Sequence, residues 1–278
     1  MVIVKIIGGL GNQMFQYAYA KTLEIQGYDV QIDSSAFKNY KLHNYGLDSY
    51  NIDINIFINN NLFIKIFNKL RLNRNKIIKE KSLLFDENLL KIKDGSYIEG
   101  YFQCEKYFLN IRDELIESFI INSKLSIYTK QIEKEILKDK SSCSLHIRRG
   151  DYVSDEKSNN IHGVCSLDYY NKAIELMRNK FISISFYIFS DDIAWVKENL
   201  KVENAIYIDS EEKRIPNEDI YLMSLCTYNI IANSSFSWWG AWLNTNPNKM
   251  VIAPSRWFSD KSKEKESMDI IPSSWVRI

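Results

Sequence analysis

At 278 residues, of which 45% are hydrophobic, the chain is long enough to build two domains with buried cores. Its 36 Lys and Arg residues nearly balance its 35 Asp and Glu residues, and the formal net charge of +1 argues against nucleic acid as a partner. The 4 cysteines show neither a C-x-x-C pair nor metal-ligand spacing, so we expect reduced thiols in a cytoplasmic protein.

The chain begins with the pattern of a strand, a glycine-rich loop and a helix. Residues 2–7 form a nearly continuous β-branched run, which predicts a strand buried on both faces, and residues 14–25 carry apolar side chains at helical spacing. A dinucleotide fingerprint would need glycine where Met14 stands, so we disfavour a Rossmann dehydrogenase. The loop Gly8-Gly-Leu-Gly-Asn-Gln13 instead lets backbone N–H groups approach a ligand, with Asn12 as a neutral donor and acceptor. A tight turn without a ligand is the alternative.

Residues 28–108 predict two further strands and one amphipathic segment. The strands are expected at residues 28–33 and 96–99. Residues 59–81 are basic and place apolar side chains on one face, which fits a helix with a solvated face better than a helix on a membrane surface. No apolar run approaches the roughly 20 residues of a membrane span. The aromatic residues in 100–108 form either a core corner or a sugar-stacking surface.

A polar stretch at residues 138–142 marks the expected domain boundary. Before it, residues 114–138 predict a helix with a break near 121–124. After it, strands alternate with short helices, which predicts a doubly wound parallel sheet. The strands are expected at 143–147, 185–190, 205–208, 228–232 and 250–253, and the helices at 167–180, 193–200, 217–226 and 236–244.

Two arginines follow the strand that opens this second half. Residues 143–147 alternate apolar and polar side chains, and His146-Ile-Arg-Arg-Gly-Asp151 leads out of the strand. Ligands collect at the carboxyl ends of strands in an open α/β sheet, and a guanidinium group matches phosphate oxygens. Arg148 and Arg149 therefore predict an anion site. The alternative is a surface arginine pair held by Asp151.

The ends of two later strands carry polar residues that could hydrogen-bond to a nucleotide. Asp191 and Asp192 end a strand and start a helix, so one caps the helix and the other could accept hydrogen bonds from guanine. Asn233-Ser-Ser235 precedes a helix whose N–H groups would cradle a phosphate, and the tryptophans after it are expected in the core. Neither Asp191-Asp192 nor Asp209-Ser-Glu211 reproduces a D-x-D metal element, so we expect arginines to neutralise the leaving group instead.

Five blocks of the sequence, in this order and spread over nearly the whole chain, resemble the signature blocks of the bacterial galactoside α-1,2-fucosyltransferases. They are GGLGNQMFQY at 8–17, GYFQ at 100–103, HIRRGDY at 146–152, FSDD at 189–192 and NSSFSWWGAW at 233–242. The resemblance implies an α/β fold of the GT-B type with two Rossmann-like domains. These would be an acceptor-side domain at 1–140 and a GDP-fucose-binding domain at 141–278.

The same resemblance implies the reaction. L-Fucose would pass from GDP-β-L-fucose, with inversion and without a metal or other cofactor, to the 2-hydroxyl group of a terminal β-galactoside in an O-antigen or other surface glycan. Residues 51–93 match no block and should carry the acceptor preference, and peripheral contact with the inner membrane is a further expectation. Two alternatives remain open: an inverting transferase for another nucleotide sugar, and a sugar-nucleotide-binding module without activity.

Roles for individual residues also follow from the resemblance. Arg148 would hold the pyrophosphate, Asn12 would lie near fucose and phosphate, and Asp191 or Asp192 would read guanine. Asp151 is the expected base, with Asp155, Glu156, His162 or no base as alternatives. The full set expected to bind GDP-fucose is Gly9, Gly11, Asn12, Gln13, His146, Arg148, Arg149, Asp191, Asp192, Asn233, Ser234, Ser235 and Phe236.

Overall fold

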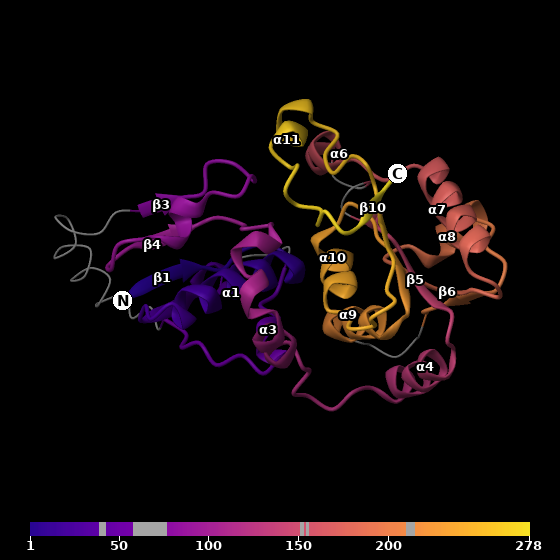
Figure 1. Ribbon diagram of the computed structural model, residues 1–278, viewed down its shortest axis with the longest axis horizontal. Helices are drawn as coiled ribbons and strands as arrows, with labels where there is room; N and C mark the ends of the chain where they lie inside the picture. The colour runs from indigo at the N-terminus through magenta and orange to yellow at the C-terminus, as the bar shows by residue number, and fades with distance from the viewer. Residues whose placement is uncertain (39–42, 58–76, 151–152, 154–155, 210–214) are drawn as a thin grey trace. The chain divides into compact units, whose positions relative to one another are not determined.

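The computed structural model describes residues 1–38, 43–57, 77–150, 153, 156–209 and 215–278 (Figure 1). These residues form two compact units. The first comprises Met1–Asn122 and Met268–Ile270, and the second comprises Ser123–Ser267 and Ile271–Ile278. Each unit is built on a parallel sheet with helices packed on it, which confirms the predicted α/β class.

The first unit has a four-stranded sheet in the order β2-β1-β4-β3, with every pair parallel. β1 is central and its Val2, Ile3 and Val4 are fully buried, as the β-branched run predicted. The elements of this unit are β1 (Val2–Lys5), α1 (Leu10–Ile25), β2 (Val30–Asp33), β3 (Ile77–Lys79), β4 (Tyr97–Glu99) and α3 (Arg112–Ser118), with 3₁₀ turns at Ser35–Lys38, Leu47–Ser49, Glu87–Leu90, Glu105–Tyr107 and Leu109–Ile111.

The glycine segment differs from its prediction. α1 begins at Leu10 with Gly9 as its N-cap, so residues 10–13 form the first turn of the helix instead of a loop before it. Gly11 and Gln13 are buried in this turn, and Gln13 makes hydrogen bonds that hold it in place. Tertiary contacts thus override the low helix propensity of glycine.

The predicted amphipathic helix at 59–81 is wrong at its end. Residues 77–79 are strand β3, because Ile77 and Ile78 pair in parallel with Tyr97 and Ile98 of β4. Residues 59–76 lie outside the described residues. The pairing partner is far away in the sequence, so the local pattern did not contain it.

The predicted helix at 114–138 is divided into α3 and α4 (Ile127–Lys138), with the break where it was expected. α4 packs against α9 (Pro216–Leu225), where the buried carboxylate of Glu218 accepts hydrogen bonds from Ser126 and Thr129. α4 therefore belongs to the second unit. The structure divides the chain after Asn122, earlier than the boundary expected near residue 140.

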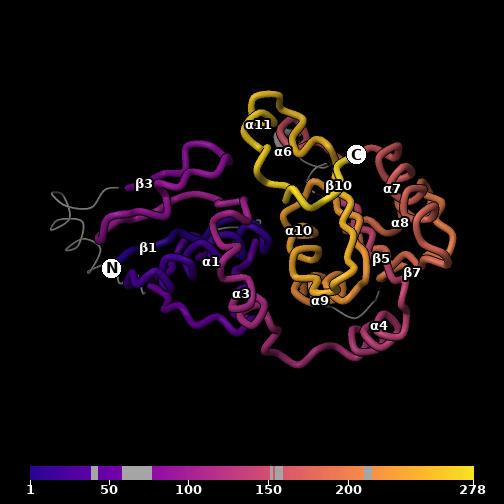
Figure 2. Tube along the Cα trace, in the orientation of Figure 1, coloured from indigo at the N-terminus to yellow at the C-terminus, as the bar shows by residue number. Residues whose placement is uncertain are grey.

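The second unit has a six-stranded parallel sheet in the order β10-β9-β8-β5-β6-β7. Counted from β5, this is the order 3-2-1-4-5-6 of doubly wound nucleotide-binding sheets. α7 and α8 cover one face, and α9 and α10 cover the other (Figures 1 and 2). Its remaining elements are β5 (Ser142–Ile147), α6 (Glu156–His162), α7 (Leu167–Lys180), β6 (Ser185–Ser190), α8 (Ile193–Asn199), β7 (Ala205–Tyr207), β8 (Tyr228–Ile230), α10 (Ser235–Trp242), β9 (Val251–Ala253), α11 (Lys261–Lys265) and β10 (Val276–Arg277).

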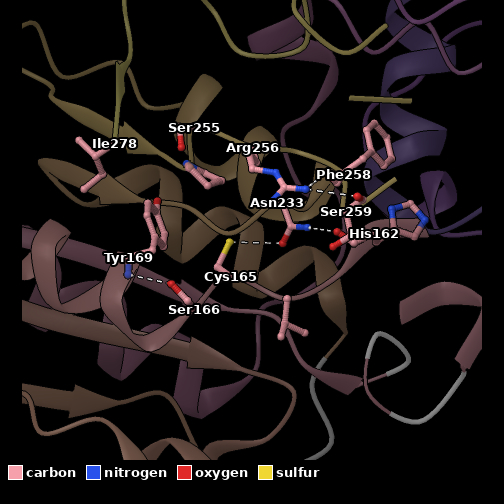
Figure 3. Close-up of a pocket in the computed structure, with 12 residues that line it drawn as sticks. His162, Cys165, Ser166, Tyr169, Asn233, Ser255, Arg256, Phe258, Ser259 and Ile278 are labelled. Carbon is pink, nitrogen blue, oxygen red and sulfur yellow. Dashed lines mark hydrogen bonds between the residues drawn. The ribbon is translucent and has the colours of Figure 1, made fainter. Parts of the chain in front are cut away.

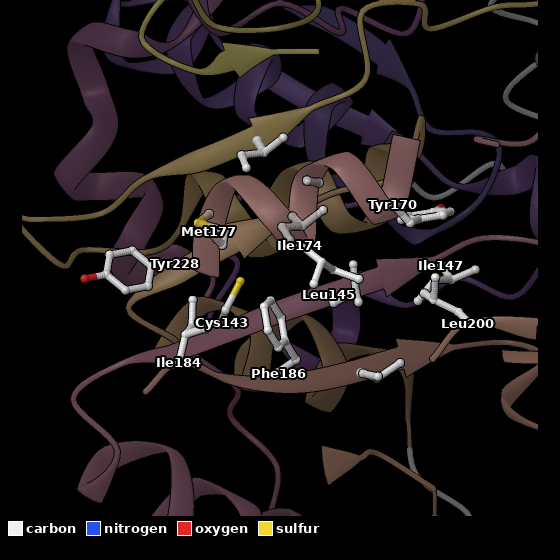
Figure 4. Close-up of a cluster of buried hydrophobic side chains, with 14 of the residues drawn as sticks. Cys143, Leu145, Ile147, Tyr170, Ile174, Met177, Ile184, Phe186, Leu200 and Tyr228 are labelled. Carbon is white, nitrogen blue, oxygen red and sulfur yellow. The ribbon is translucent and has the colours of Figure 1, made fainter. Parts of the chain in front are cut away.

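β5 lies in the middle of the sheet and is buried on both faces. Cys143, Leu145 and Ile147 pack in the core beneath α7 and α8 (Figure 4). The alternate residues face α9 and α10, where Ser144 accepts a hydrogen bond from Asn229 and the His146 ring packs against Phe236. The alternation seen in the sequence therefore separates an apolar face from a polar one inside a fully buried strand.

Candidate functional site

The carboxyl ends of β5 and β8 are neighbours at the point where the strand order of the second unit reverses. Ligands of doubly wound sheets bind in the crevice outside this switch point. Arg148 and Arg149 follow β5 directly, and Asn233 and Ser234 stand shortly after β8. The fold thus places a cationic strand end beside the start of α10.

Both arginines are held by the aspartates that follow β6. The Arg148 guanidinium Nη1 lies 2.9 Å from Asp191 Oδ2, and the Arg149 backbone N–H donates to Asp191 Oδ1 at 2.9 Å. Arg149 Nε donates to Asp192 Oδ2 at 3.3 Å, and the guanidinium lies 3.5 Å from the centre of the Trp195 ring. Arg149 is therefore held by a carboxylate and an aromatic ring, whereas Arg148 keeps 27% of its side chain exposed.

The two aspartates have structural partners of their own. Asp192 Oδ1 accepts from the backbone N–H of Trp195 and caps α8, which is the capping role expected for one of the pair. A Cβ atom on Gly150 would lie 2.4 Å from Asp191 Oδ2, so a larger residue there would push this carboxylate from its place beside Arg148. The aspartates orient the arginines here, and guanine recognition by either one stays a prediction. Asp151, the expected base, lies outside the described residues.

His146 is buried directly beneath the arginines, with 4% of its surface exposed. Burial, and secondarily the charge of Arg148, lowers the pKa of His146 to about 3. Its Nδ1 atom has no hydrogen-bond partner among the described residues. His146 is therefore neutral near pH 7 and adds no positive charge to the anion site.

This buried histidine predicts an acid-sensitive fold. In the unfolded chain His146 takes up a proton below about pH 6.5, whereas in the folded protein it stays neutral down to a pKa of about 3. The unfolded state binds more protons in this window, so the free energy of unfolding should fall as the pH drops. Between about pH 6 and pH 4, the free energy of unfolding of the wild type should fall with pH more steeply than that of His146→Asn. The difference in slope should be roughly 1.4 kcal/mol per pH unit. Denaturant titrations of both proteins at several pH values measure this difference. The carboxylates titrate alike in both proteins, so their contribution cancels. Parallel plots of the free energy of unfolding against pH would contradict the prediction.

The side chain of Asn233 is used within the protein. It is 3% exposed, and its amide nitrogen donates to the carbonyl oxygens of His162, Gly163 and Trp257 at 3.0, 3.2 and 3.1 Å. Its oxygen accepts from the Cys165 thiol at 3.4 Å. Through these hydrogen bonds Asn233 joins three chain segments behind the sheet edge, and its expected contact with the donor stays a prediction.

The start of α10 has the form that the sequence predicted. Ser234 is the N-cap, and its hydroxyl accepts from the backbone N–H of Phe236 at 3.3 Å. Ser235 and Phe236 are half-buried in the first turn. The tryptophans that follow are almost fully buried and contact one another, which confirms their expected place in the core; they are Trp238, Trp239 and Trp242.

A pocket of about 220 Å³ lies at the carboxyl ends of β8 and β9 (Figure 3). Its lining includes His162, Tyr169, Asn233, Arg256 and Phe258. The exposed Arg256 guanidinium donates to the Ser259 carbonyl oxygen at 3.2 Å. One cation and aromatic walls beside a strand end suit part of a sugar nucleotide. Sequence reasoning missed Arg256, although it follows its strand closely, as Arg148 follows β5.

The first unit holds the remaining predicted contacts, which are Asn12, Gln13, Gly9 and Gly11. Asn12 is half-buried in the first turn of α1, and its Oδ1 accepts from Gln103 Nε2 at 2.6 Å. Gln13, also expected to bind the donor, is fully buried. Its amide donates to the carbonyl oxygens of Gly8 and Asn44 and accepts from the N–H of Gly46. The expectation for the Gln13 side chain is therefore corrected, because it fixes the turn from inside.

Among the described residues, no group of three or more His, Cys, Asp or Glu side chains is arranged to hold a metal ion. No helix in the described part of the chain is both long and apolar enough to cross a bilayer.

A family profile and two bacterial relatives match this chain over nearly its full length. The profile of the family described as Glycosyl transferase family 11 matches residues 1–278. An alpha-1,2-colitosyltransferase of Escherichia coli is 38% identical over 100% of this chain and 99% of its own length. The O-antigen biosynthesis glycosyltransferase WbnK of Escherichia coli is 34% identical over 98% of both chains.

More distant relatives include a galactoside 2-alpha-L-fucosyltransferase of Bos taurus, 24% identical over 54% of this chain and 43% of its own length. The solved structure of NodZ alpha-1,6-fucosyltransferase, soaked with GDP-fucose, superposes with a TM-score of 0.51 at 12% identity, covering 87% of this chain and 91% of that one. This likeness concerns the fold, which is the GT-B type with two Rossmann-like domains.

Proposed function

The chain belongs to glycosyl transferase family 11, and we propose that it transfers L-fucose from GDP-β-L-fucose to the 2-hydroxyl group of a terminal β-galactoside. The glycan would be an O-antigen or another surface polysaccharide. The observation that carries the proposal is the arginine pair at the switch point of a doubly wound sheet, beside the start of α10. The galactoside fucosyltransferase relatives support this choice of sugar and linkage.

The chemistry needs a cation where Arg148 stands. Transfer from a β-linked donor to an α-linked product inverts the anomeric carbon, so the acceptor hydroxyl attacks from the face opposite the diphosphate. Negative charge then grows on the leaving oxygen, and a preorganised guanidinium group stabilises it without reorganising. Asp191 holds Arg148 in position, and the N–H groups in the first turn of α10 offer further donors to phosphate oxygens.

Colitose is the second candidate sugar, because the colitosyltransferase relative matches the whole chain at 38% identity, whereas the fucosyltransferase relative matches about half at 24%. Colitose is L-fucose without its 3-hydroxyl group. A site that hydrogen-bonds this hydroxyl would reject the deoxy sugar by a factor of about 10⁴ or more, whereas an apolar site would discriminate by only about 10². The ratio of kcat/KM for the two GDP sugars therefore also reports the chemistry of the sugar pocket.

A panel of donors crossed with acceptors tests the proposal. GDP-fucose, GDP-colitose, and UDP and ADP sugars would each be offered with lactose, N-acetyllactosamine and galactosyl-β-1,3-N-acetylhexosamine. We expect acceptor-dependent GDP release with GDP-fucose and an α-1,2 linkage in the product. Transfer from UDP or ADP sugars alone would exclude the proposal. A binding module would bind a nucleotide sugar without any turnover.

Transfer should not require a divalent cation. Arg148 and the N-terminus of α10 can neutralise the diphosphate by themselves, so we expect full activity in EDTA. Product formation before and after chelation, with and without added Mn²⁺, measures this. Activity that is lost in EDTA and restored by Mn²⁺ alone would contradict it.

A further inference from the structure

The amide of Asn12 is held in one orientation by Gln103, which comes from a turn 91 residues further along the chain. Gln103 Nε2 donates to Asn12 Oδ1 at 2.6 Å, and Gln103 is buried, with 8% of its surface exposed. This bond takes one of the two lone pairs of the Asn12 oxygen and turns that oxygen toward Gln103. The NH₂ group on the other arm of the amide only donates.

We propose that Gln103 is a positioning residue that makes Asn12 a hydrogen-bond donor toward the transferring sugar or the diphosphate. This inference rests on the proposed function, because that function supplies the ligand of Asn12. The group recognised would be an oxygen that accepts, such as a phosphate oxygen, a sugar ring oxygen or the leaving oxygen. A flipped amide would present its own oxygen to that group and repel it.

The turn that carries Gln103 is built around a half-buried carboxylate. Glu80 Oε2 accepts from the backbone N–H groups of Tyr101 at 2.7 Å and Phe102 at 3.2 Å. Burial raises the pKa of the Glu80 carboxyl, and these two hydrogen bonds oppose that rise. Glu80 follows β3, so pairing of β3 with β4 brings the carboxylate to the turn.

Phe102 has φ of +52°, a left-handed conformation that is unfavourable for residues other than glycine. It persists because its fully buried ring stacks on Tyr19 of α1, with ring centres 3.8 Å apart and planes within 8°. A Cβ atom on Gly100 would lie 2.6 Å from the Phe102 ring and 2.7 Å from Glu80 Cβ, so no larger residue fits. The strained backbone at Phe102 is held by contacts on several sides, and it orients the next residue, Gln103. Strain kept in this way points to a functional role for Gln103.

Close packing and buried hydrogen bonds also fix the part of the chain around Asn12. Gly8 has φ of +82°, and a Cβ atom there would lie 2.8 Å from Asn12 Nδ2. Gln16 is fully buried and joins the two parts: it donates to the carbonyl oxygen of Gly100 at 2.9 Å and accepts from the N–H of Ile7 at 2.8 Å. The end of β1, the first turns of α1 and the Gly100 turn therefore form one hydrogen-bonded assembly.

Gln103→Glu tests the direction of the hydrogen bond with almost no change in shape. When the introduced carboxyl group is ionised it only accepts, so the Asn12 NH₂ must turn toward it and the Asn12 oxygen must face the ligand. When the same carboxyl group is protonated, it donates to Asn12 Oδ1 as glutamine does. We expect kcat with the best donor to fall about 10- to 100-fold near neutral pH and to recover as the pH is lowered. Gln103→Met, which cannot donate, should lose activity equally at every pH.

Three further measurements make the result decisive. Gln131→Glu on the exposed face of α4 is the matched charge control and should behave like the wild type. Calorimetric affinity for GDP-fucose without acceptor should show the same pH dependence in Gln103→Glu, which gives a readout independent of transfer. Glu80→Gln should lower kcat when it is introduced into the wild type. Introduced into Gln103→Met, it should lower kcat little further, since both substitutions act through the contact between Gln103 and Asn12.

The outcomes separate the inference from the proposed function. If the wild type transfers no sugar from any donor, the proposed function fails, and the GDP-fucose affinity of Gln103→Glu alone decides the role of Gln103. If the wild type transfers sugar but Gln103→Glu keeps wild-type kcat and affinity across the pH range, the inference is overturned. A loss of thermal stability in Gln103→Glu that accounts for its lost activity would overturn it as well.

Discussion

Replacing Arg148 with alanine is expected to lower kcat by about 10²–10³-fold, the usual effect of removing one preorganised donor from a developing charge. The charge on the leaving oxygen is greater in the transition state than in the bound donor. The loss should therefore appear in kcat more than in the KM for GDP-fucose. Steady-state kinetics with the donor varied at saturating acceptor measure both parameters.

Two variants make this result specific. Arg148→Lys should rescue poorly, because an ammonium group cannot make the two parallel hydrogen bonds of a guanidinium group. Arg178→Ala removes an exposed arginine of α7 that pairs with Glu203, and it should leave the kinetics unchanged. An Arg148→Ala protein with wild-type kcat would remove the basis of the proposed mechanism. Arg149→Ala should lower the stability of the protein as well as its activity, since Arg149 packs on Trp195.

Asn233→Asp should destabilise the second unit by roughly 3–5 kcal/mol. The change keeps the shape of the side chain but removes its donors. The carbonyl oxygens of His162, Gly163 and Trp257 would then face a buried carboxylate at about hydrogen-bond distance. The free energy of unfolding, measured by denaturant titration, gives the size of the effect.

Asn199→Asp is the matched control for this substitution. Asn199 donates one hydrogen bond to the carbonyl oxygen of Trp195 on the exposed end of α8, and we expect a cost below about 1 kcal/mol. If Asn233 served only as a contact for the donor, Asn233→Asp would weaken GDP binding at unchanged stability. That pattern would refute the structural role assigned to Asn233.

The doubly wound sheet of the second unit could be predicted because its signals are local. Short apolar strands alternate with helical patterns from residue 142 onward, and each strand end carries its own polar residues. Parallel pairing brings such strand ends to one edge whatever the details of packing. The arginines after β5, the cap of α8 and the first turn of α10 were therefore placed correctly from the sequence.

The partners of those residues could not be predicted in the same way. Asp191 and Asp192, 42 and 43 residues beyond Arg149, hold the arginine pair in the structure, a role that the sequence did not indicate for them. Asp151, which the sequence offered for this role, lies outside the described residues. The sequence indicated only a ligand contact for Asn233, whereas the structure shows that its amide also donates to three carbonyl groups of other segments. Hydrogen bonds between distant segments leave no periodic signal in the chain.

The sequence by itself determined the α/β class, the doubly wound second half and the residue types at each strand end, because periodicity, turn residues and motif spacing are properties of neighbouring residues. Only the tertiary structure decided that β3 is a strand, that α4 packs with the second unit and that Gln103 holds Asn12. Each of these depends on a partner tens of residues away. Long-range pairing and burial fix which polar side chains are used up inside the protein and which can meet a substrate.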